Sequence, residues 1–228
     1  MPPLELTIRR KLYRRAGASP VEAVRDLSLS FPTGSVTALL GPSGCGKTTA
    51  LRILMGLDSD FEGEVRHRPQ RLGVVFQEPR LLPWRSLGEN LRIVARAAGL
   101  PSPPVEALLA RVGLAGWAVR LPRELSLGMA RRAALARALA VEPELLVLDE
   151  PFVSLDEATA AQLRALIGEV LAERRATAVL VTHALEDAAA LADRVAMLSP
   201  RPARLLRLVE VPRGDVLALR AALATAPP

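Results

Sequence analysis

The nine residues "GPSGCGKTT", 41–49, are the most informative part of this sequence. They lie between a short apolar stretch at 34–41 and a stretch of helical character at 46–56. Their spacing matches G-x-x-x-x-G-K-[ST], a pattern that requires a strand before it and a helix after it. Glycines there let successive backbone N–H groups and the helix N-terminus converge on phosphate. A glycine-rich turn that matches by chance is the alternative, and the flanking elements argue against it.

Side chains of this loop predict how a nucleoside triphosphate and its magnesium ion are held. Lys47 can bridge the β- and γ-phosphates, and the Thr48 hydroxyl can ligate Mg²⁺. Thr49 is a candidate for one more phosphate contact. The other predicted nucleotide-binding residues are those of the loop itself: Gly41, Pro42, Ser43, Gly44, Cys45 and Gly46.

A second stretch, "ELLVLDE" at 144–150, supplies carboxylates. Its continuous apolar run is typical of a buried parallel strand, and Asp149 emerges at the carboxyl end, where α/β sheets place ligands. Asp149 can hold the Mg²⁺ shell, and Glu150 can take a proton from a water that attacks the γ-phosphate. An acidic strand end that merely faces solvent is the alternative.

The rest of the pattern indicates an α/β fold. Strands at 71–77, 177–183 and 194–199 and helices at 157–174 and 184–192 alternate along the second half, which favours a parallel sheet. Two N-terminal stretches, 5–13 and 24–31, alternate apolar and polar residues as half-buried strands do. Ala/Leu/Arg-rich helices are predicted at 88–98, 104–112 and 127–140, and residues 201–228 are less informative.

Three further polar residues narrow the class. Gln77 ends the strand at 71–77 and could contact Mg²⁺ or the attacking water. His183 ends the strand at 177–183 and could donate to the γ-phosphate, although a structural histidine is an equally simple interpretation. Asp156, in "VSLDE", is compatible with an ordinary helix N-cap.

Bulk composition limits the setting of the protein. The 228 residues carry a net charge of +6, which suits a solvated basic surface, and no Lys/Arg cluster with interleaved aromatics favours nucleic acid as a partner. Cys45 is the single cysteine, so no internal disulfide can form, which fits a reducing cytoplasm. No apolar run approaches the roughly 18 residues that span a bilayer, and the N-terminus lacks a signal-peptide core.

The order of these motifs resembles that of the ATP-binding subunits of ABC transporters. "FQEPRLLPWRSLGENL" at 76–91 and "RVAMLSPRPARLL" at 194–206 are most similar to importer subunits for nitrate, sulfonate or taurine. The resemblance implies one domain over 1–228: a P-loop NTPase (RecA-like) core, an N-terminal antiparallel β-subdomain and a helical insertion at about 78–140. It also implies ATP and Mg²⁺ as cofactors and Tyr13 as the aromatic that stacks on adenine, although Tyr13 could simply be a strand aromatic.

In that family two cassettes face each other head to tail. Lys47, Gln77, Glu150 and His183 would act in catalysis, and Thr48, Gln77 and Asp149 would hold the metal. The signature turn of these cassettes is the start of the helix at 127–140, with Ser126 and Gly128. This turn of one cassette would cover the ATP bound by its partner, which is a second copy or a different paired subunit. The implied partners are a membrane permease and, indirectly, a substrate-binding protein, which places the chain at the cytoplasmic face of the membrane.

The signature turn departs from the family pattern, because Leu127 replaces the first of two glycines. Ser126 as N-cap would leave the N–H groups of residues 127–129 facing an anion, and these amides need no particular side chain. Leucine costs little if its φ is helical and weakens closure if its φ must be positive. Two rival functions stay open: a soluble non-transport ABC ATPase, and an ATP-binding regulatory module with little turnover.

Overall fold

The computed structural model describes residues 2–14, 19–174, 177–210 and 213–225. The chain divides into two compact units. The first unit comprises residues 1–69 and 177–228, and the second comprises residues 70–176.

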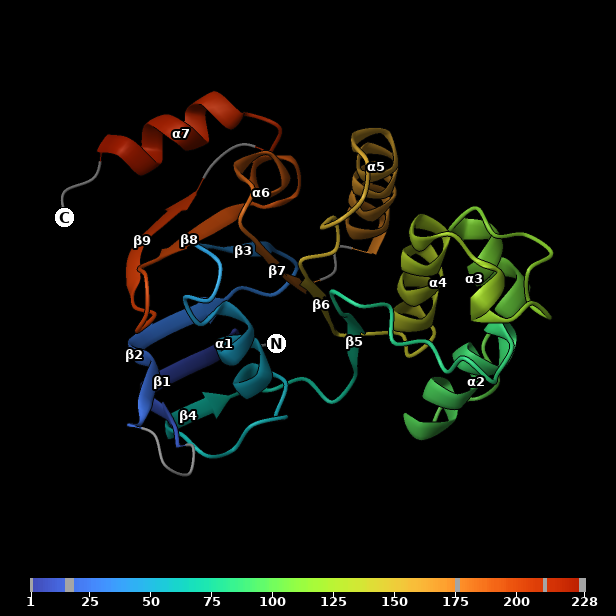
Figure 1. Cartoon of the computed structure of the whole chain (residues 1–228), viewed down its shortest axis with the longest axis horizontal. Helices are drawn as coiled ribbons and strands as arrows, with labels where there is room; N and C mark the ends of the chain where they lie inside the picture. The colour runs from blue at the N-terminus through green and yellow to red at the C-terminus, as the bar shows by residue number, and fades with distance from the viewer. Residues whose placement is uncertain (1, 15–18, 175–176, 211–212, 226–228) are drawn as a thin grey trace. The chain divides into compact units, whose positions relative to one another are not determined.

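An antiparallel three-stranded sheet forms the N-terminal part of the first unit (Figure 1). Its strands are β1 (Leu4–Tyr13), β2 (Val21–Phe31) and β4 (Glu62–Arg66), in the order β2-β1-β4. The expected N-terminal antiparallel subdomain is therefore confirmed. Its third strand, β4, was not predicted, because most of its side chains are exposed and show no apolar alternation.

A second group of strands in the first unit includes the strands that precede the glycine-rich loop and His183. β3 (Val36–Leu40) pairs in parallel with both β7 (Thr177–Thr182) and β8 (Arg194–Leu198), and β9 (Leu205–Glu210) pairs antiparallel with β8. Every residue of β3 and β7 is buried, as expected for strands covered on both faces.

The helices of the first unit are α1 (Lys47–Leu54), α6 (Leu185–Leu191) and α7 (Val216–Thr225). α1 begins directly after the glycine-rich loop, as the sequence predicts. α7, red in Figure 1, lies beside β9 and α6, in the stretch for which the sequence made no prediction.

The second unit combines a parallel strand pair with most of the helices. β5 (Leu72–Val75) pairs with β6 (Leu145–Asp149). The helices of this unit are α2 (Leu87–Ala97), α3 (Val105–Arg111), the 3₁₀ turn η1 (Pro122–Glu124), α4 (Leu127–Leu139) and α5 (Glu157–Arg174). α4 contacts β5 and each of the other three α-helices of the unit, so it forms the centre of this unit's packing.

Local sequence explains where α2 starts. The Ser86 hydroxyl accepts the Glu89 N–H, and the Glu89 carboxylate accepts the Ser86 N–H, which together form a capping box at the start of α2. None of the helices formed by the described residues is both long enough and apolar enough to cross a bilayer.

Candidate functional site

The glycine-rich loop connects β3 to α1, which confirms the predicted strand–loop–helix order. Gly44 and Gly46 have φ values of 72° and 129°, a region that favours glycine. A Cβ atom on Gly46 would also lie 2.6 Å from the carbonyl oxygen of Ala23. Backbone conformation and close approach therefore both require glycine at position 46.

Lys47 is the buried cation of this loop, with only 4% of its surface exposed. Its ammonium donates hydrogen bonds to the carbonyl oxygens of Gly41 at 2.7 Å and Pro42 at 2.9 Å. These bonds hold the ammonium against the loop. Its contact with phosphate stays a prediction. The Thr48 side chain is exposed at the start of α1, where a hydroxyl can reach a ligand.

Residues of the loop between β8 and β9 contact the glycine-rich loop and hold its backbone. The Arg201 guanidinium donates to the Gly44 carbonyl oxygen from Nε at 3.1 Å and from a terminal nitrogen at 2.8 Å. The Cβ atom of Ala203 lies 3.0 Å from the position that a Cβ on Gly46 would take. Sequence reasoning missed this support, because no local pattern links residues 201–203 to a loop 150 residues earlier.

Tyr13 lies at the end of β1, next to the start of α1. Its phenol oxygen is 3.3 Å from the Thr49 hydroxyl and 3.4 Å from an Asp58 carboxylate oxygen. The Lys11 ammonium lies 4.8 Å from the centre of the Tyr13 ring. Tyr13, 42% exposed, thus lies beside the end of the phosphate loop. Its stacking on adenine stays a prediction.

The buried Lys11 and the half-buried Asp58 form an ion pair beside Tyr13, with 2.9 Å between the ammonium and a carboxylate oxygen. Burial opposes both charges, and the hydrogen bond and attraction between them outweigh it. The pKa of Lys11 is therefore raised above its ordinary value, and the pKa of Asp58 is lowered. The pair joins β1 to the segment after α1.

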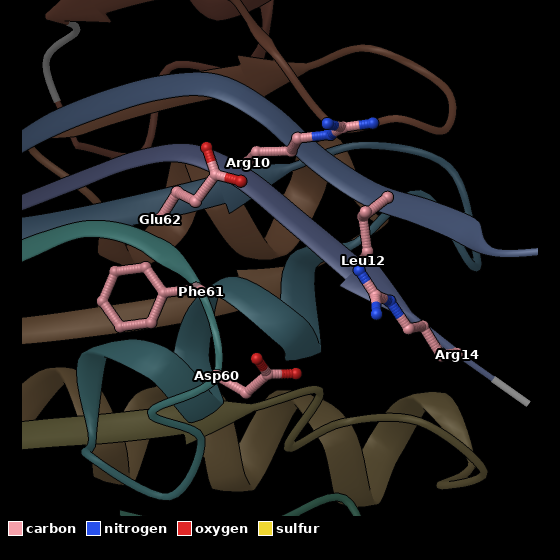
Figure 2. Close-up of a pocket in the computed structure, with 6 residues that line it drawn as sticks. All are labelled: Arg10, Leu12, Arg14, Asp60, Phe61 and Glu62. Atoms are coloured by element: carbon pink, nitrogen blue, oxygen red, sulfur yellow. The ribbon is translucent and has the colours of Figure 1, made fainter.

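An open pocket of about 360 Å³ lies at the end of β1 and the start of β4 (Figure 2). Its lining residues are Arg10, Leu12, Arg14, Asp60, Phe61 and Glu62. The pocket mixes two guanidinium groups with two carboxylates, and its lining includes none of the residues predicted to bind nucleotide.

His183 was predicted as the last residue of a strand, but β7 ends at Thr182, so His183 directly follows the strand. Its side chain is exposed. The turn that carries it is fixed by Thr182, whose hydroxyl accepts the Ala184 N–H at 3.0 Å and donates to the Asp187 carboxylate at 3.1 Å. An exposed imidazole on a fixed turn can donate to a ligand.

The carboxylates of the second unit lie at the end of β6. Asp149 is its last residue and is buried, and Glu150 follows with a half-buried side chain. The φ of Glu150 is 47°, which is unusual for a residue other than glycine. Such strain is common at functional positions, which is consistent with the predicted role of Glu150.

Gln77 lies in the loop after β5, and its side chain is exposed. The prediction placed it at the end of the strand, but β5 ends at Val75. The Arg137 guanidinium of α4 holds this loop by donating to the carbonyl oxygens of Pro79 and Arg80.

Ser126 caps α4, as predicted, because its hydroxyl accepts the Met129 N–H at 3.3 Å. That bond corrects one detail: the N–H of residue 129 is paired and does not face outward. Leu127 is the first residue of α4 and is 44% exposed. Its φ is not positive. Leucine therefore causes no backbone strain at this position.

At Gly128 a side chain is excluded by packing and not by backbone conformation, because α5 passes close to this residue. A Cβ atom on Gly128 would lie 2.6 Å from Cγ2 of Thr159. Thr159 is itself fixed, because its hydroxyl donates to Asp156 at 2.6 Å and its N–H donates to the same carboxylate at 3.0 Å. Asp156 is therefore a helix cap, and its bonds to Thr159 lower its pKa.

The predicted site residues are divided between the two units. The first unit brings together Tyr13 and the loop 41–49 and also carries His183. The second unit carries Gln77, Asp149 and Glu150, together with the signature residues Ser126 and Gly128.

Comparison with known proteins agrees with this arrangement of motifs. The family model described as "ABC transporter" matches residues 24–153. The aliphatic sulfonates import ATP-binding protein SsuB 2 of Burkholderia cenocepacia is 48% identical over 210 residues, which cover 89% of this chain and 76% of that protein. SsuB 1 of Pseudomonas aeruginosa is 43% identical over 224 residues, which cover 92% of this chain and 87% of that protein.

A solved structure has the same fold. The dimeric, post-hydrolysis ATP-binding cassette MJ0796, bound to ADP and Pi, matches with a TM-score of 0.79 and 27% identity over 91% of this chain and 98% of that one. The predicted α/β cassette fold is thus confirmed. The chain belongs to the ABC transporter family, in which it is an ATP-hydrolysing cassette subunit.

Proposed function

We propose that this chain supplies the ATP hydrolysis that powers an importer for aliphatic sulfonates. The main support is the combination of a complete phosphate loop around Lys47 with 48% identity to a sulfonate-import subunit. Nitrate and taurine, the other substrates that the sequence suggested, are less well supported, because the similar relatives quoted above carry the sulfonate name.

In this proposal the first unit binds the nucleotide. The backbone amides of residues 41–49 and the Lys47 ammonium contact the phosphates, and Tyr13 stacks on the adenine. His183 donates a hydrogen bond to the γ-phosphate. Residues 1–228 act as one ATPase domain, with the helical insertion at about 78–140.

The second unit supplies the chemistry of hydrolysis. Glu150 accepts a proton from the attacking water, and Gln77 helps to orient that water. The donor set suits Mg²⁺, which prefers a few hydroxyl, amide and carboxylate oxygens beside substrate phosphates. Thr48, Gln77 and Asp149 would hold the ion, which would neutralise charge on the phosphates. No cluster of three or more His, Cys, Asp or Glu occurs among the described residues, and such a site needs none.

Two cassettes would enclose each ATP. Ser126 and Gly128 of one copy would cover ATP held by the loop 41–49 of the other, and the pair is either two copies of this chain or a mixed pair. The solved cassette with the same fold is dimeric. A permease docked on the chain at the cytoplasmic face, with a substrate-binding protein outside, would complete the importer.

The test is reconstitution of the chain with its permease in proteoliposomes. ATP hydrolysis should rise when the substrate-binding protein is loaded with an alkanesulfonate, and nitrate should leave it unchanged. Stimulation by nitrate alone would contradict the substrate assignment. Co-purification with ribosomes or nucleic acid in place of a permease would favour the soluble rival.

A further inference from the structure

Arg131, on α4, is a buried cation whose partners are all main-chain carbonyl groups. Only 3% of its surface is exposed. One terminal nitrogen donates to the carbonyl oxygens of Glu150 at 3.1 Å and Pro151 at 2.8 Å, and the other donates to Val153 at 3.0 Å. All of these residues belong to the second unit.

This arrangement costs free energy. Burial lowers the pKa of Arg131, because the charged form loses its hydration. Its Nε has no hydrogen-bond partner among the described residues, and no carboxylate pairs with the guanidinium there. An apolar side chain of similar volume would avoid these costs. We infer that the benefit of arginine at position 131 lies in the three carbonyl groups that it holds in place, those of Glu150, Pro151 and Val153.

Those bonds hold a strained segment. Glu150 has a φ of 47° and Ser154 a φ of 64°. Arg131 therefore bonds to one of these left-handed residues, Glu150, and to two residues between them, Pro151 and Val153. Such conformations persist only where the surroundings impose them. Arg131 binds the carbonyl of Glu150 itself, and so fixes the peptide plane next to the Cα atom that carries the Glu150 side chain.

We propose that Arg131 is a positioning residue that aims the Glu150 carboxylate and ties that aim to the signature turn. The inference rests on the proposed function, in which Glu150 is the general base. Ser126 caps the same helix five residues before Arg131. In that function the signature turn covers the ATP that the partner binds, and Glu150 acts on the ATP that its own chain binds. If α4 shifts when the partner's site closes, the shift reaches Glu150 through the buried, hydrogen-bonded Arg131 side chain.

The neighbouring Arg132 offers a matched control. It lies on the same helix, is less buried, and donates to the Gln162 side chain of α5 at 2.6 Å. Arg132→Met removes an equal charge and a helix–helix bond without touching the segment 150–153. A general effect of lost charge or loosened helix packing would change both variants alike.

The experiment measures steady-state ATP hydrolysis by the purified full chain and by Arg131→Met, Arg131→Lys and Arg132→Met. Arg131→Met should lower kcat at least ten-fold with KM for Mg-ATP within about two-fold, because the phosphate loop belongs to the other unit. Arg131→Lys, which can still reach one or two carbonyls, should recover part of kcat. Arg132→Met should stay within two-fold of the parent.

A double variant separates positioning from general damage. In the Glu150→Gln background, Arg131→Met should lower turnover by less than two-fold further, because the base it positions is already lost. Unchanged kcat in Arg131→Met, equal losses in Arg131→Met and Arg132→Met, or full additivity with Glu150→Gln would overturn the inference. If Arg131→Met fails to fold, Arg131→Gln replaces it under the same criteria.

The two proposals fail in distinguishable ways. If Glu150→Gln keeps parental turnover, Glu150 is not the general base, and the mechanism of hydrolysis in the proposed function fails together with the positioning role. If Glu150→Gln is inactive while Arg131→Met is fully active, only the positioning role fails.

Discussion

The Lys47 ammonium donates to the Gly41 carbonyl oxygen at 2.7 Å, across the loop that joins β3 to α1. The bond closes the loop around its own lysine, whose side chain is almost completely buried. Because the bonds to Gly41 and Pro42 already restrict the lysine side chain, we expect it to lose little conformational freedom when it binds phosphate.

Lys47→Ala should abolish ATP hydrolysis and weaken Mg-ATP binding. Loss of a charge-assisted hydrogen bond costs about 1.5–3 kcal/mol, which corresponds to a roughly 10- to 100-fold weaker Kd. Isothermal titration calorimetry measures the Kd. Arg52→Ala, an exposed position on the same helix, is the control and should bind like the parent. Equal affinities for Lys47→Ala and the parent would exclude the loop as the phosphate site.

Glu150→Gln should leave nucleotide binding intact and lower turnover by roughly 10²–10⁴, as expected for loss of a general base. Since ATP would then persist between two cassettes, the variant should dimerise in Mg-ATP. Light scattering behind size-exclusion chromatography detects this dimer. A variant that stays monomeric at saturating Mg-ATP, even with its permease supplied, would argue against a shared nucleotide.

The structure resolves a question that the sequence left open at Leu127. Because Leu127 has ordinary helical backbone and an exposed side chain, Leu127→Gly should change ATPase activity by less than ten-fold. The free energy of unfolding should fall by no more than about 1 kcal/mol, since glycine is a poor helix residue. A rise in turnover of ten-fold or more would mean that leucine impairs the native site.

Gly128→Ala should behave differently, because the new methyl group would meet Thr159 at 2.6 Å. Thr159 cannot rotate away without losing its bond to Asp156. Overpacking of this kind costs about 1–3 kcal/mol, which a thermal unfolding experiment detects as a lower Tm. Thr159→Ser keeps the hydroxyl and removes the obstructing methyl group. The double variant should recover most of the lost Tm, and a failure to recover it would place the strain elsewhere.

Sequence patterns predicted the parts of the fold in which local chemistry and local structure agree. β3, β6 and β7 are short, buried and mostly apolar runs. Gly41 follows β3, Asp149 and Glu150 stand at the end of β6, and His183 follows β7, in the order that the sequence predicts. β4 was missed because its mostly exposed sequence, EGEVR, has one apolar residue other than glycine. β9, LLRLVE, is mostly apolar, but its apolar and polar residues do not alternate, and its side chains are only half-buried or exposed. α7 was missed because its stretch carries no recognisable motif.

The supports of the site could not be predicted, because they are long-range contacts. Arg201 reaches Gly44 across 157 residues, and Arg131 reaches Glu150 across 19. Nothing in the sequence distinguishes either arginine from the surface arginines of this basic chain. The role of Leu127 likewise depended on a backbone angle, which sequence alone leaves undetermined.

The Lys11–Asp58 pair beside Tyr13 predicts a pH-dependent stability. The folded-state pKa of Asp58 is lowered, so its contribution is present above the unfolded pKa of about 4 and is lost as pH falls through the folded value. Lys11→Met leaves the half-buried Asp58 carboxylate without its cation and should cost about 1.5–3 kcal/mol near pH 7, as expected for the loss of a charge-assisted hydrogen bond. Towards pH 3 the carboxylate of the variant is protonated, so the difference from the parent should shrink. Urea unfolding at both pH values measures it, with exposed Arg9→Met as the control. A difference that stays constant with pH would mean that lost packing, and not the unpaired Asp58 charge, destabilises the variant.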